Sequence, residues 1–438
     1  MLKKFSFLFS MLLMMTILSG NGLSLNNIGT KSIAIGGAYI SLAEDATAVY
    51  WNPARLSAQK THLLAFATDI IPMTSYKNDD MNIDTETEMN HYISPNFFAN
   101  YNLGKFALGF GAFVPSGIGT DWNGEDLLAF NGPAYLDPSQ TIPNPYAEKV
   151  FEWKSEIAVL DFSPACAYKI NDRISLGAAL NIYYGMLNLK RPEDMLDVTS
   201  NPGTPQSGTD HMMDTQTAFD VTGMGYGATI GLAWECLLLE NLNFGLTYRT
   251  PSTVEFEGDA DIDLQGVGKK DAEMDIEWPT WIGFGSSYKF NEKLTLAFDL
   301  HYSDWSSVDT LVAKIKDMPD GQGGTYTRIQ KMPQNWEAKT QIRLGASYML
   351  SECLTLRSGY YYDPAPAPDE TLNILFPSST NHVGTMGFSY KFNKKFSMDF
   401  ASEYLFGAER DVEQAEHNMP GKHQMDILTF SLGLKYCL

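Results

Sequence analysis

Basic residues are scarce in this sequence. The chain of 438 residues carries 31 Lys and Arg against 52 Asp and Glu, which gives a formal net charge of −21 at pH 7. A charge of this sign and size repels the phosphates of DNA and RNA, so the sequence argues against a nucleic-acid partner. An acidic chain of this kind indicates an exposed, well-solvated surface.

Long apolar runs are also missing, with one exception at the N-terminus. Lys3 and Lys4 precede an apolar stretch from Phe5 to Leu18, and small or short residues follow at 20–22. This layout predicts that residues 1–22 are a secretory signal peptide. A membrane anchor is the alternative, although the run is shorter than the ~20 residues of a spanning helix. Any membrane residence of the remaining chain must come from β-structure.

Cysteine is sparse as well. The four cysteines lie far apart, and no two of them form a Cys-x-x-Cys pair. Disulfides formed after export and free thiols both stay open, because spacing alone cannot pair cysteines. The four are Cys166, Cys236, Cys353 and Cys437.

Signatures of metals, cofactors and catalysis are weak. Asp259, Asp261 and Asp263 alternate as in a calcium loop, but the glycine and the glutamate that complete such a loop are not in place. His417 and His423 share one loop without a recognised ligand spacing. No nucleophile and base stand in an interpretable pattern. We therefore predict no metal, no cofactor and no enzymatic activity.

What the sequence has instead is long alternation of apolar and polar residues. From Leu428 to Leu438, for example, every second residue is apolar. Such alternation indicates a β-strand with one apolar face, and about ten alternating residues suit a strand that crosses a bilayer. We count about fourteen such segments, centred near residues 66, 97, 109, 161, 180, 226, 248, 284, 300, 342, 358, 387, 400 and 431.

The connections between these segments alternate in length. Short turns occur, and between them lie longer polar stretches, which we expect to be loops at 71–91, 114–153, 189–215, 259–275, 309–333, 364–380 and 408–424. Short turns on one side and long loops on the other are typical of outer-membrane barrels. The fold class is therefore predicted as all-β, a transmembrane antiparallel β-barrel of about 14 strands. A secreted array of β-sandwiches or a propeller is the alternative.

One stretch, Gly29–Ala54, does not alternate. It is rich in small residues and ends in Asn52-Pro53-Ala54. Because a barrel of fourteen strands is too wide for wall side chains to fill, we predict that this stretch plugs the lumen. The expected organisation is a signal peptide at 1–22, an N-terminal hatch at 23–60, and a barrel with long extracellular loops at 61–438.

Several motifs stand out in the hatch stretch and at strand ends. They are Gly36-Gly37-Ala38, Glu44-Asp45-Ala46, Asn52-Pro53-Ala54, the stretch 113–117 with Thr120-Asp121-Trp122, Asp304-Trp305-Ser306, the run 343–348 and the run 359–364. Over nearly the whole mature chain, the sequence resembles the FadL/TodX-type outer-membrane transporters of long-chain fatty acids and aromatic hydrocarbons. The resemblance implies fourteen strands, a hatch in the lumen and diffusion of apolar ligands. Leu438 and Arg55 depart from the family, which usually has a terminal aromatic and frequently a glycine there.

Two groups of candidate site residues follow. The hatch signature comprises Gly36, Gly37, Asn52, Pro53 and Ala54, and the last three are expected to hold or release the hatch. A plain turn is the alternative for the last three, because Asn-Pro commonly opens turns. The second group consists of Gly109, Gly111, Pro115 and Gly117. Gly and Pro interrupt strand pairing, so we predict a kink that opens the wall toward the bilayer, with a simple strand end as the alternative.

A third group is predicted to bind ligand. Arg343 and Arg357 lie on polar strand faces, where a guanidinium binds a carboxylate bidentately; internal ion networks are the alternative. Leu23 and Leu25 are expected at the floor of a lumen pocket. Three apolar loop residues are expected to catch ligands at the cell surface, with packing inside the loop as the alternative: Trp122, Leu127 and Phe130.

The predicted function is passive uptake of hydrophobic small molecules across the outer membrane. Long-chain fatty acids are the first expectation and aromatic hydrocarbons the second. The expected partners are the ligand and membrane lipids, and we expect a monomer. A structural or adhesion barrel is one rival hypothesis. A lipid-acting hydrolase that uses Ser303 near His301 is another.

Overall fold

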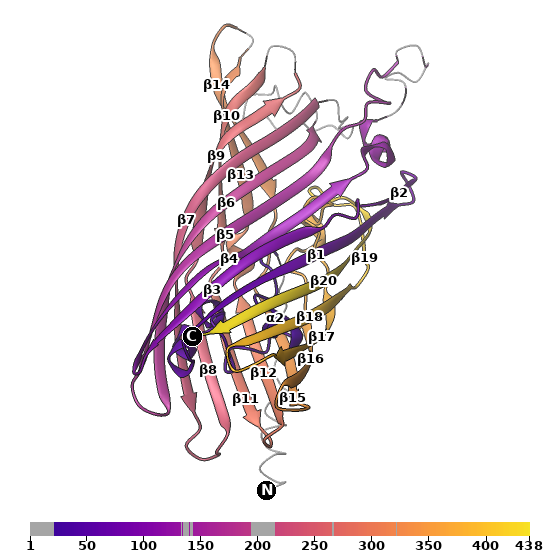
Figure 1. Ribbon diagram of the computed structural model, residues 1–438. Coiled ribbons are helices and arrows are strands. Elements are labelled where there is room, and N and C mark those ends of the chain that lie inside the picture. The colour runs from indigo at the N-terminus through magenta and orange to yellow at the C-terminus, as the bar shows by residue number, and fades with distance from the viewer. Residues whose placement is uncertain are drawn as a thin grey trace.

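Fourteen antiparallel strands close into a barrel in the computed structural model, which describes residues 22–132, 134, 140, 143–193, 215–264, 267–320 and 322–438 (Figure 1). The first and last strands, β1 and β20, pair along sixteen positions and close the cylinder. The fold therefore agrees with the predicted class and strand number. The predicted signal peptide lies outside the described residues, apart from Gly22.

Ten strands of the barrel run without a break. They are β1 (His62–Asn78), β3 (Tyr92–Leu103), β4 (Phe106–Trp122), β5 (Trp153–Lys169), β6 (Ile174–Glu193), β7 (Thr215–Glu235), β16 (Leu354–Asp363), β17 (Asn381–Lys391), β18 (Phe396–Gly407) and β20 (Gly421–Cys437).

The other four strands each consist of two pieces. The pairs are β8 (Leu242–Arg249) with β9 (Ser252–Ile262), β10 (Gly268–Trp278) with β11 (Trp281–Lys289), β12 (Leu294–Ser303) with β13 (Thr310–Pro319), and β14 (Thr325–Pro333) with β15 (Lys339–Met349). Pro251 and Pro279 lie in the breaks of the first two strands, where a residue without a backbone N–H cannot continue the ladder.

Short elements lie between the long strands. They are β2 (Ile83–Glu86), which pairs with β1, η2 (Gly124–Asn131), η3 (Trp305–Ser307) in the break between β12 and β13, η4 (Asp369–Thr371) and β19 (Arg410–Val412), which pairs with β20. Among the described residues, no helix is long and apolar enough to cross a membrane. All four cysteines are free thiols.

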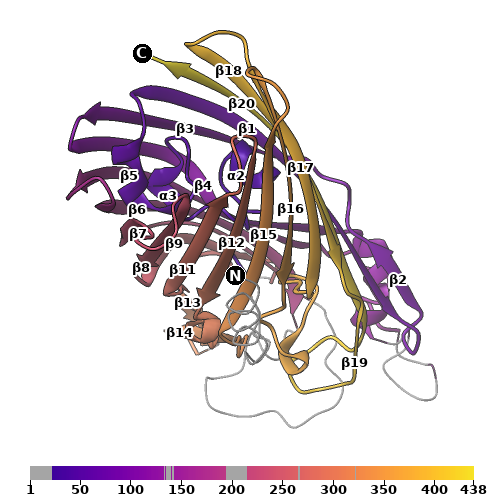
Figure 2. The ribbon, with the colours of Figure 1, turned by 90° about the horizontal axis from the view of Figure 1, so that it is seen from below.

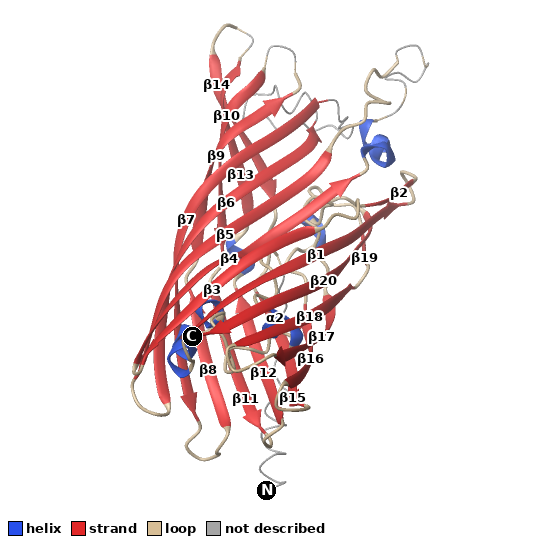
Figure 3. Cartoon of the chain, in the orientation of Figure 1, coloured by secondary structure: helices blue, strands red, loops and turns tan. Residues whose placement is uncertain are grey.

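The wall is tall on one side and short on the other. Figures 1 and 3 show β5–β7, β9, β10, β13 and β14 rising well above β16–β18 and β20. The predicted loops at 259–275 and 309–333 were wrong, because both stretches form hairpins, β9–β10 and β13–β14. The loops predicted at 71–91 and 114–153 also begin too early, since β1 continues to Asn78 and β4 to Trp122.

A change of polarity along the strands explains this error. In the lower wall, Leu246 faces outward and Thr247 faces inward, so apolar outward residues alternate with polar inward ones. This is the alternation from which the strands were predicted. In the tall part, Glu255 and Glu257 face outward while Val254 and Phe256 are buried inside. The strands thus stand in water above the bilayer, where the alternation persists with acidic residues on the outside.

The segment before β1 lies inside the barrel (Figure 2). It contains α2 (Thr30–Ala34), α3 (Ala48–Trp51) and η1 (Pro53–Ala58), and nearly all of its side chains are buried. β1 begins at His62, shortly after the predicted end of the hatch. We call residues 22–60 the hatch from here on; the domain division of the whole chain stays a prediction.

Glycines of the wall allow the hatch backbone to lie directly against the strands. A Cβ atom on Gly359 would lie 2.3 Å from the backbone of Ile35 and Gly36, and one on Gly177 would lie 2.3 Å from that of Pro53 and Ala54. Glycine inside a strand weakens it, so these positions indicate that close contact with the hatch is needed there.

The seam that closes the barrel also contacts the hatch. Ser431 of β20 lies with its hydroxyl 3.0 Å from that of Thr68 on β1. The same Ser431 oxygen lies 2.8 Å from the Thr30 hydroxyl of the hatch. One side chain therefore joins the first strand, the last strand and the hatch.

Candidate functional site

Polar side chains of the wall fasten the body of the hatch. The Asp299 carboxylate of β12 accepts hydrogen bonds from the backbone N–H groups of Tyr39, at 2.8 Å, and Ile40, at 2.9 Å. The Asn52 amide donates to the Ile40 carbonyl of the hatch and to the Leu232 carbonyl of the wall, at 3.2 and 3.1 Å. Asn52 also accepts from the Ala54 N–H. It therefore connects the start of η1 with the Ile40 segment of the hatch and with the wall strand β7.

The two arginines predicted to bind ligand are occupied by the hatch. Arg343 donates to the Asn27 side chain at 2.9 Å and to the Asn26 carbonyl at 3.0 Å. Its guanidinium also lies 4.3 Å from the centre of the Tyr361 ring. Arg357 contacts the Glu44 carboxylate at 3.1 Å. This arrangement matches the alternative reading of an internal polar network.

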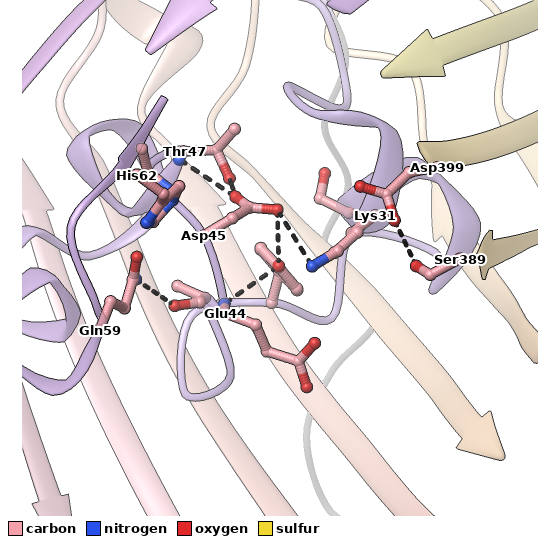
Figure 4. A network of polar contacts seen from close by, with 12 residues as sticks. Lys31, Glu44, Asp45, Thr47, Gln59, His62, Ser389 and Asp399 are labelled. Atoms are coloured by element: carbon pink, nitrogen blue, oxygen red, sulfur yellow. Dashed lines mark hydrogen bonds and ion pairs between the residues drawn. The ribbon is translucent and has the colours of Figure 1, made fainter. Parts of the chain in front are cut away.

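Asp45 is the centre of a second network inside the hatch (Figure 4). Its carboxylate accepts from the Thr47 N–H at 3.1 Å and the Thr47 hydroxyl at 2.5 Å, and it lies 3.8 Å from the Lys31 amine. Burial opposes ionisation of Asp45, but the nearby Lys31 amine and the Thr47 hydrogen bond contribute to a lowered pKa of this carboxyl. The ion pair therefore keeps its charge in the docked hatch.

A neighbouring histidine completes this contact with the wall. The Nε2 atom of His62, at the start of β1, accepts from the Ala46 N–H at 2.8 Å. In the sequence, Glu44-Asp45-Ala46 stood out only through the resemblance to the family, which did not indicate these contacts. Nothing in the spacing of Lys31 and Asp45 signals that they meet, because the hatch has no regular period.

The seam between β3 and β4 is open in its upper part. These strands pair only from Phe97 with Ala112 down to Leu103 with Phe106. Higher up, an isolated bridge joins Thr87 to Trp122. We call the unpaired region between these two edges the window; its sides are residues 92–96 of β3 and 113–121 of β4.

A β-bulge in β4 shapes the window. The pairing of β4 with β5 shifts between Phe113 and Ser116, so that β4 carries one extra residue there. The Pro115 carbonyl accepts from the Leu25 N–H of the hatch at 2.9 Å. The Val114 N–H donates to the Asn96 side chain of β3 at 3.0 Å, so a side chain replaces the missing strand pairing.

The predicted kink residues take different places around the bulge. Gly109 and Gly111 lie lower, in the paired part of the seam, and Gly109 faces the hatch side chains of Leu56 and Val49. Pro115 lies in the bulge itself, and Gly117 lies beside the window. A role of these residues in ligand exit stays a prediction.

A cavity of about 760 Å³ passes through the window. Leu25 and Phe113 line it on the lumen side. Ile93 and Phe97, which are 68% and 41% exposed on the lipid-facing surface, line it on the outer side. The cavity is therefore shared between the lumen and the outer face of the barrel.

The remaining predicted residues lie outside this cavity. Leu23 packs in a large apolar cluster of the tall wall. Trp122 and Leu127 are 4% and 1% exposed and pack together with Phe130 in another cluster under the loops. This cluster also contains Tyr76 of β1 and Trp153 of β5, so the three residues pack against the wall; a role in catching ligands stays a prediction.

The last two features to place are His301, from the hydrolase hypothesis, and the candidate metal ligands. His301 is buried between the rings of Trp51 and Trp281, at 5.6 and 5.0 Å between ring centres. Its Nε2 atom lies 3.4 Å from Asp299. In the described part of the chain, no three His, Cys, Asp or Glu side chains are placed to hold a metal ion.

A closed barrel with an apolar outer belt, charged hairpins above it and an internal plug defines an outer-membrane β-barrel protein. The profile described as "Outer membrane protein transport protein (OMPP1/FadL/TodX)" matches residues 139–436. The chain belongs to this family, and the protein is located in the bacterial outer membrane.

Curated relatives and solved structures agree with this assignment. Outer membrane protein P1 of Haemophilus influenzae is 23% identical over 395 residues, which are 85% of this chain and 83% of that protein. The long-chain fatty acid transport protein of Escherichia coli K12 is 22% identical over 292 residues, 60% of this chain and 63% of that protein. The relatives are distant, so residue roles do not transfer without a matching contact.

The fold is also that of solved family members. A FadL homologue of Pseudomonas aeruginosa superposes with a TM-score of 0.75 at 17% identity, covering 95% of this chain and all of that one. The toluene transporter TodX of Pseudomonas putida gives 0.72 at 19% identity, covering 96% and 99%. At these identities the likeness shows the fold alone.

Proposed function

We propose that the protein takes up hydrophobic small molecules by diffusion, with the cavity as binding site and the window as the exit into the bilayer. The cavity that spans the unpaired β3–β4 seam is the observation that supports this most. An unpaired strand edge facing lipid is unfavourable. An opening at this seam therefore favours a function for it, such as the passage of a ligand. Release of an apolar ligand into water instead would be unfavourable by ~0.8 kcal/mol per exposed CH₂ group.

The tip of the hatch is the part that moves in this proposal. Leu25 is held to the bulge through the Pro115 carbonyl, and Ser24 forms a bridge to Ser116. Withdrawal of the tip, residues 22–25, would free the bulge and widen the path from lumen to window. Asn52, which binds both hatch and wall, acts as an anchor.

Long-chain fatty acids and small aromatic hydrocarbons are the two ligand classes to test first. The relatives include long-chain fatty acid transport proteins and a toluene transporter. The cavity volume falls in the usual range of small-molecule sites, roughly 300–1,000 Å³. Since one chain closes its own barrel, the proposal needs only a monomer, and it contains no catalytic step.

Loss of uptake tests the proposal. A strain that lacks the gene is compared with a complemented strain for uptake of labelled oleate, toluene and hexadecane at limiting concentration. We expect at least one of them to enter more slowly without the gene. Equal uptake of all three would reject transport and favour a structural barrel.

A further inference from the structure

Among the described residues that line the cavity, none is a lysine or an arginine. Among the described residues that line it, the titratable ones are His91, Tyr92 and Glu403. The undescribed segments after the signal peptide, which are residues 133, 135–139, 141–142, 194–214, 265–266 and 321, contain no Lys or Arg.

The polar end of the cavity presents a carboxyl group and amides. Glu403 of β18 is 7% exposed, lines the cavity and accepts a hydrogen bond from the Asn27 side chain at 2.5 Å. Asn26 and Asn381 line the cavity beside it. A ligand that reaches this end meets a hydrogen-bond acceptor of acidic character.

Arg343 contacts two residues that line the cavity, Asn26 and Asn27, but does not line the cavity itself. Arg343 directs its donors at the Asn26 carbonyl, the Gln341 side chain and the Asn27 side-chain oxygen. Asn27 accepts from Arg343 and donates to Glu403. Asn27 therefore stands between the guanidinium and the cavity.

Cations at the outer rim of the window are matched by carboxylates. Lys154 lies 3.3 Å from Asp121 and 2.9 Å from Glu156. His91, which lines the outer part of the cavity, has its Nδ1 atom 2.8 Å from Asp69. Lys154 and His91, the rim cations named here from the described residues, are therefore both paired with carboxylates and would not draw in an anion.

We infer that the cavity selects uncharged ligands, specifically hydrophobic molecules whose polar end donates a hydrogen bond, such as long-chain alcohols, and that it disfavours carboxylates. This inference rests on the proposed function and narrows its ligand class. A hydroxyl group donates to Glu403 and keeps a hydrogen bond on leaving water. An anion would lose its hydration on entering, and no Lys or Arg among the described lining residues would compensate for that loss.

Ligands that share one alkyl chain test the selection. The purified protein is placed in lipid nanodiscs, because a detergent with an alkyl chain would compete for the cavity. It is then titrated with dodecanol, laurate and dodecyl sulfonate. Dodecyl sulfonate keeps its charge at every pH used. We expect dodecanol to bind at least about tenfold more tightly than either anion, the size of effect that one lost polar interaction produces.

Two variants locate the cause. Glu403→Gln removes the acidic character and adds a donor, so the preference for dodecanol should shrink several-fold. Thr429→Lys places an amine among the lining residues of β20 and should raise the affinity for dodecyl sulfonate about tenfold. Glu255→Gln, an exposed carboxylate on the outer face of β9, is the matched control and should change neither affinity.

The outcomes separate this inference from the proposed function. Binding of laurate or dodecyl sulfonate as tightly as dodecanol would overturn the inference and leave uptake of hydrophobic molecules standing. If none of the three ligands bound and uptake did not depend on the gene, the proposed function would be wrong and the inference with it. An unchanged preference in both Glu403→Gln and Thr429→Lys would also overturn it.

Discussion

The hatch contacts the wall in two different ways on its two sides. Toward β12, β15 and β16, buried polar side chains of Asp299, Arg343 and Arg357 hold backbone or side chains of the hatch. Toward β4, the tip is joined to the bulge through the Leu25 N–H and the Ser24 bridge, and an apolar cavity lies beside it. On the side of β12, β15 and β16 the hatch is therefore fixed to the wall, and on the side of β4 it borders the cavity.

This difference separates anchoring from passage. Charged and amide groups in a dry interior fix a segment strongly, because each unmade contact leaves a buried polar group without a partner. The tip is held by the Leu25 and Ser24 contacts and by the packing of Leu23, without a buried charged group, so it opens at lower free energy than the body. Motion is therefore expected at residues 22–25, while the body of the hatch stays in place.

Removal of the extra residue in β4 should break the cavity side most completely. Deletion of Pro115 restores the register with β5, straightens the strand and removes the carbonyl that holds Leu25. We expect uptake of the transported ligand to fall to the level of the gene deletion while the barrel still assembles. Uptake by cells and heat-modifiable mobility of the barrel measure the two effects.

Substitution at the same position is the control. Pro115→Ala keeps the extra residue and the carbonyl, so uptake should stay near that of the wild type. Normal uptake after deletion of Pro115 would contradict the window as exit.

Loss of an anchoring arginine should break the docked side. Arg343→Ala leaves Asn27, Asn26 and Gln341 without their donor, at an expected cost of roughly 3 kcal/mol in hatch docking. A loosened hatch admits ions, so conductance in planar bilayers should rise. Arg173→Ala in an exposed periplasmic turn is the control, and equal conductance of the two variants would argue against anchoring by Arg343.

Acid should weaken the Asp45 network in the hatch in a defined direction. Burial opposes ionisation of Asp45, but Lys31 and Lys435 with Thr47 outweigh it, so its pKa lies below the ordinary 3.8. Because folding lowers this pKa, the ionised carboxylate stabilises the docked hatch above pH 3.8, and that contribution is lost as the pH falls through the folded-state pKa.

Hydrogen exchange of hatch amides at falling pH measures this effect. Protection should decrease below the ordinary pKa of the carboxyl. Asp45→Asn should cost about 1 kcal/mol, as for other side chains that accept from a nearby backbone N–H, and should flatten the pH profile. A profile that is equally steep in the variant would assign the effect to another group.

Alanine substitutions at two glycines beside the window should show whether Tyr92 limits passage on the cavity side. A Cβ on Gly119 would lie 2.2 Å from the Tyr92 ring, whereas one on Gly117 would meet only the Ile157 carbonyl at 3.5 Å. Gly119→Ala should therefore displace the Tyr92 ring and change the uptake rate about twofold. Gly117→Ala should leave the rate unchanged, and equal rates in both variants would remove Tyr92 from the path.

The membrane-crossing strands could be predicted from the sequence because lipid imposes one rule on them. Outward residues such as Leu246 must be apolar, and inward ones such as Thr247 alternate with them, so each expected centre falls within a strand. Above the bilayer this rule ends. Glu255 and Glu257 look like loop residues, although Val254 and Phe256 keep the strand period.

The site was less predictable for a different reason. Pro115 and the nearby glycines marked an interruption, since Pro lacks a donor wherever it occurs. The hatch partners of Arg343 lie more than 300 positions away in the sequence, and no local pattern reports such contacts. The sequence therefore left ligand binding and an internal ion network as alternatives for Arg343, and in the structure this arginine contacts the hatch.

The bond between Ser431, Thr68 and Thr30 has a consequence for biogenesis. β20 is the last strand of the chain, and it meets β1 and the hatch through the same hydroxyl group. The joint between β20, β1 and Thr30 is complete only when the hatch lies in the lumen, so hatch docking and closure of the seam stabilise each other. A barrel that closed without its hatch would lack part of its seam.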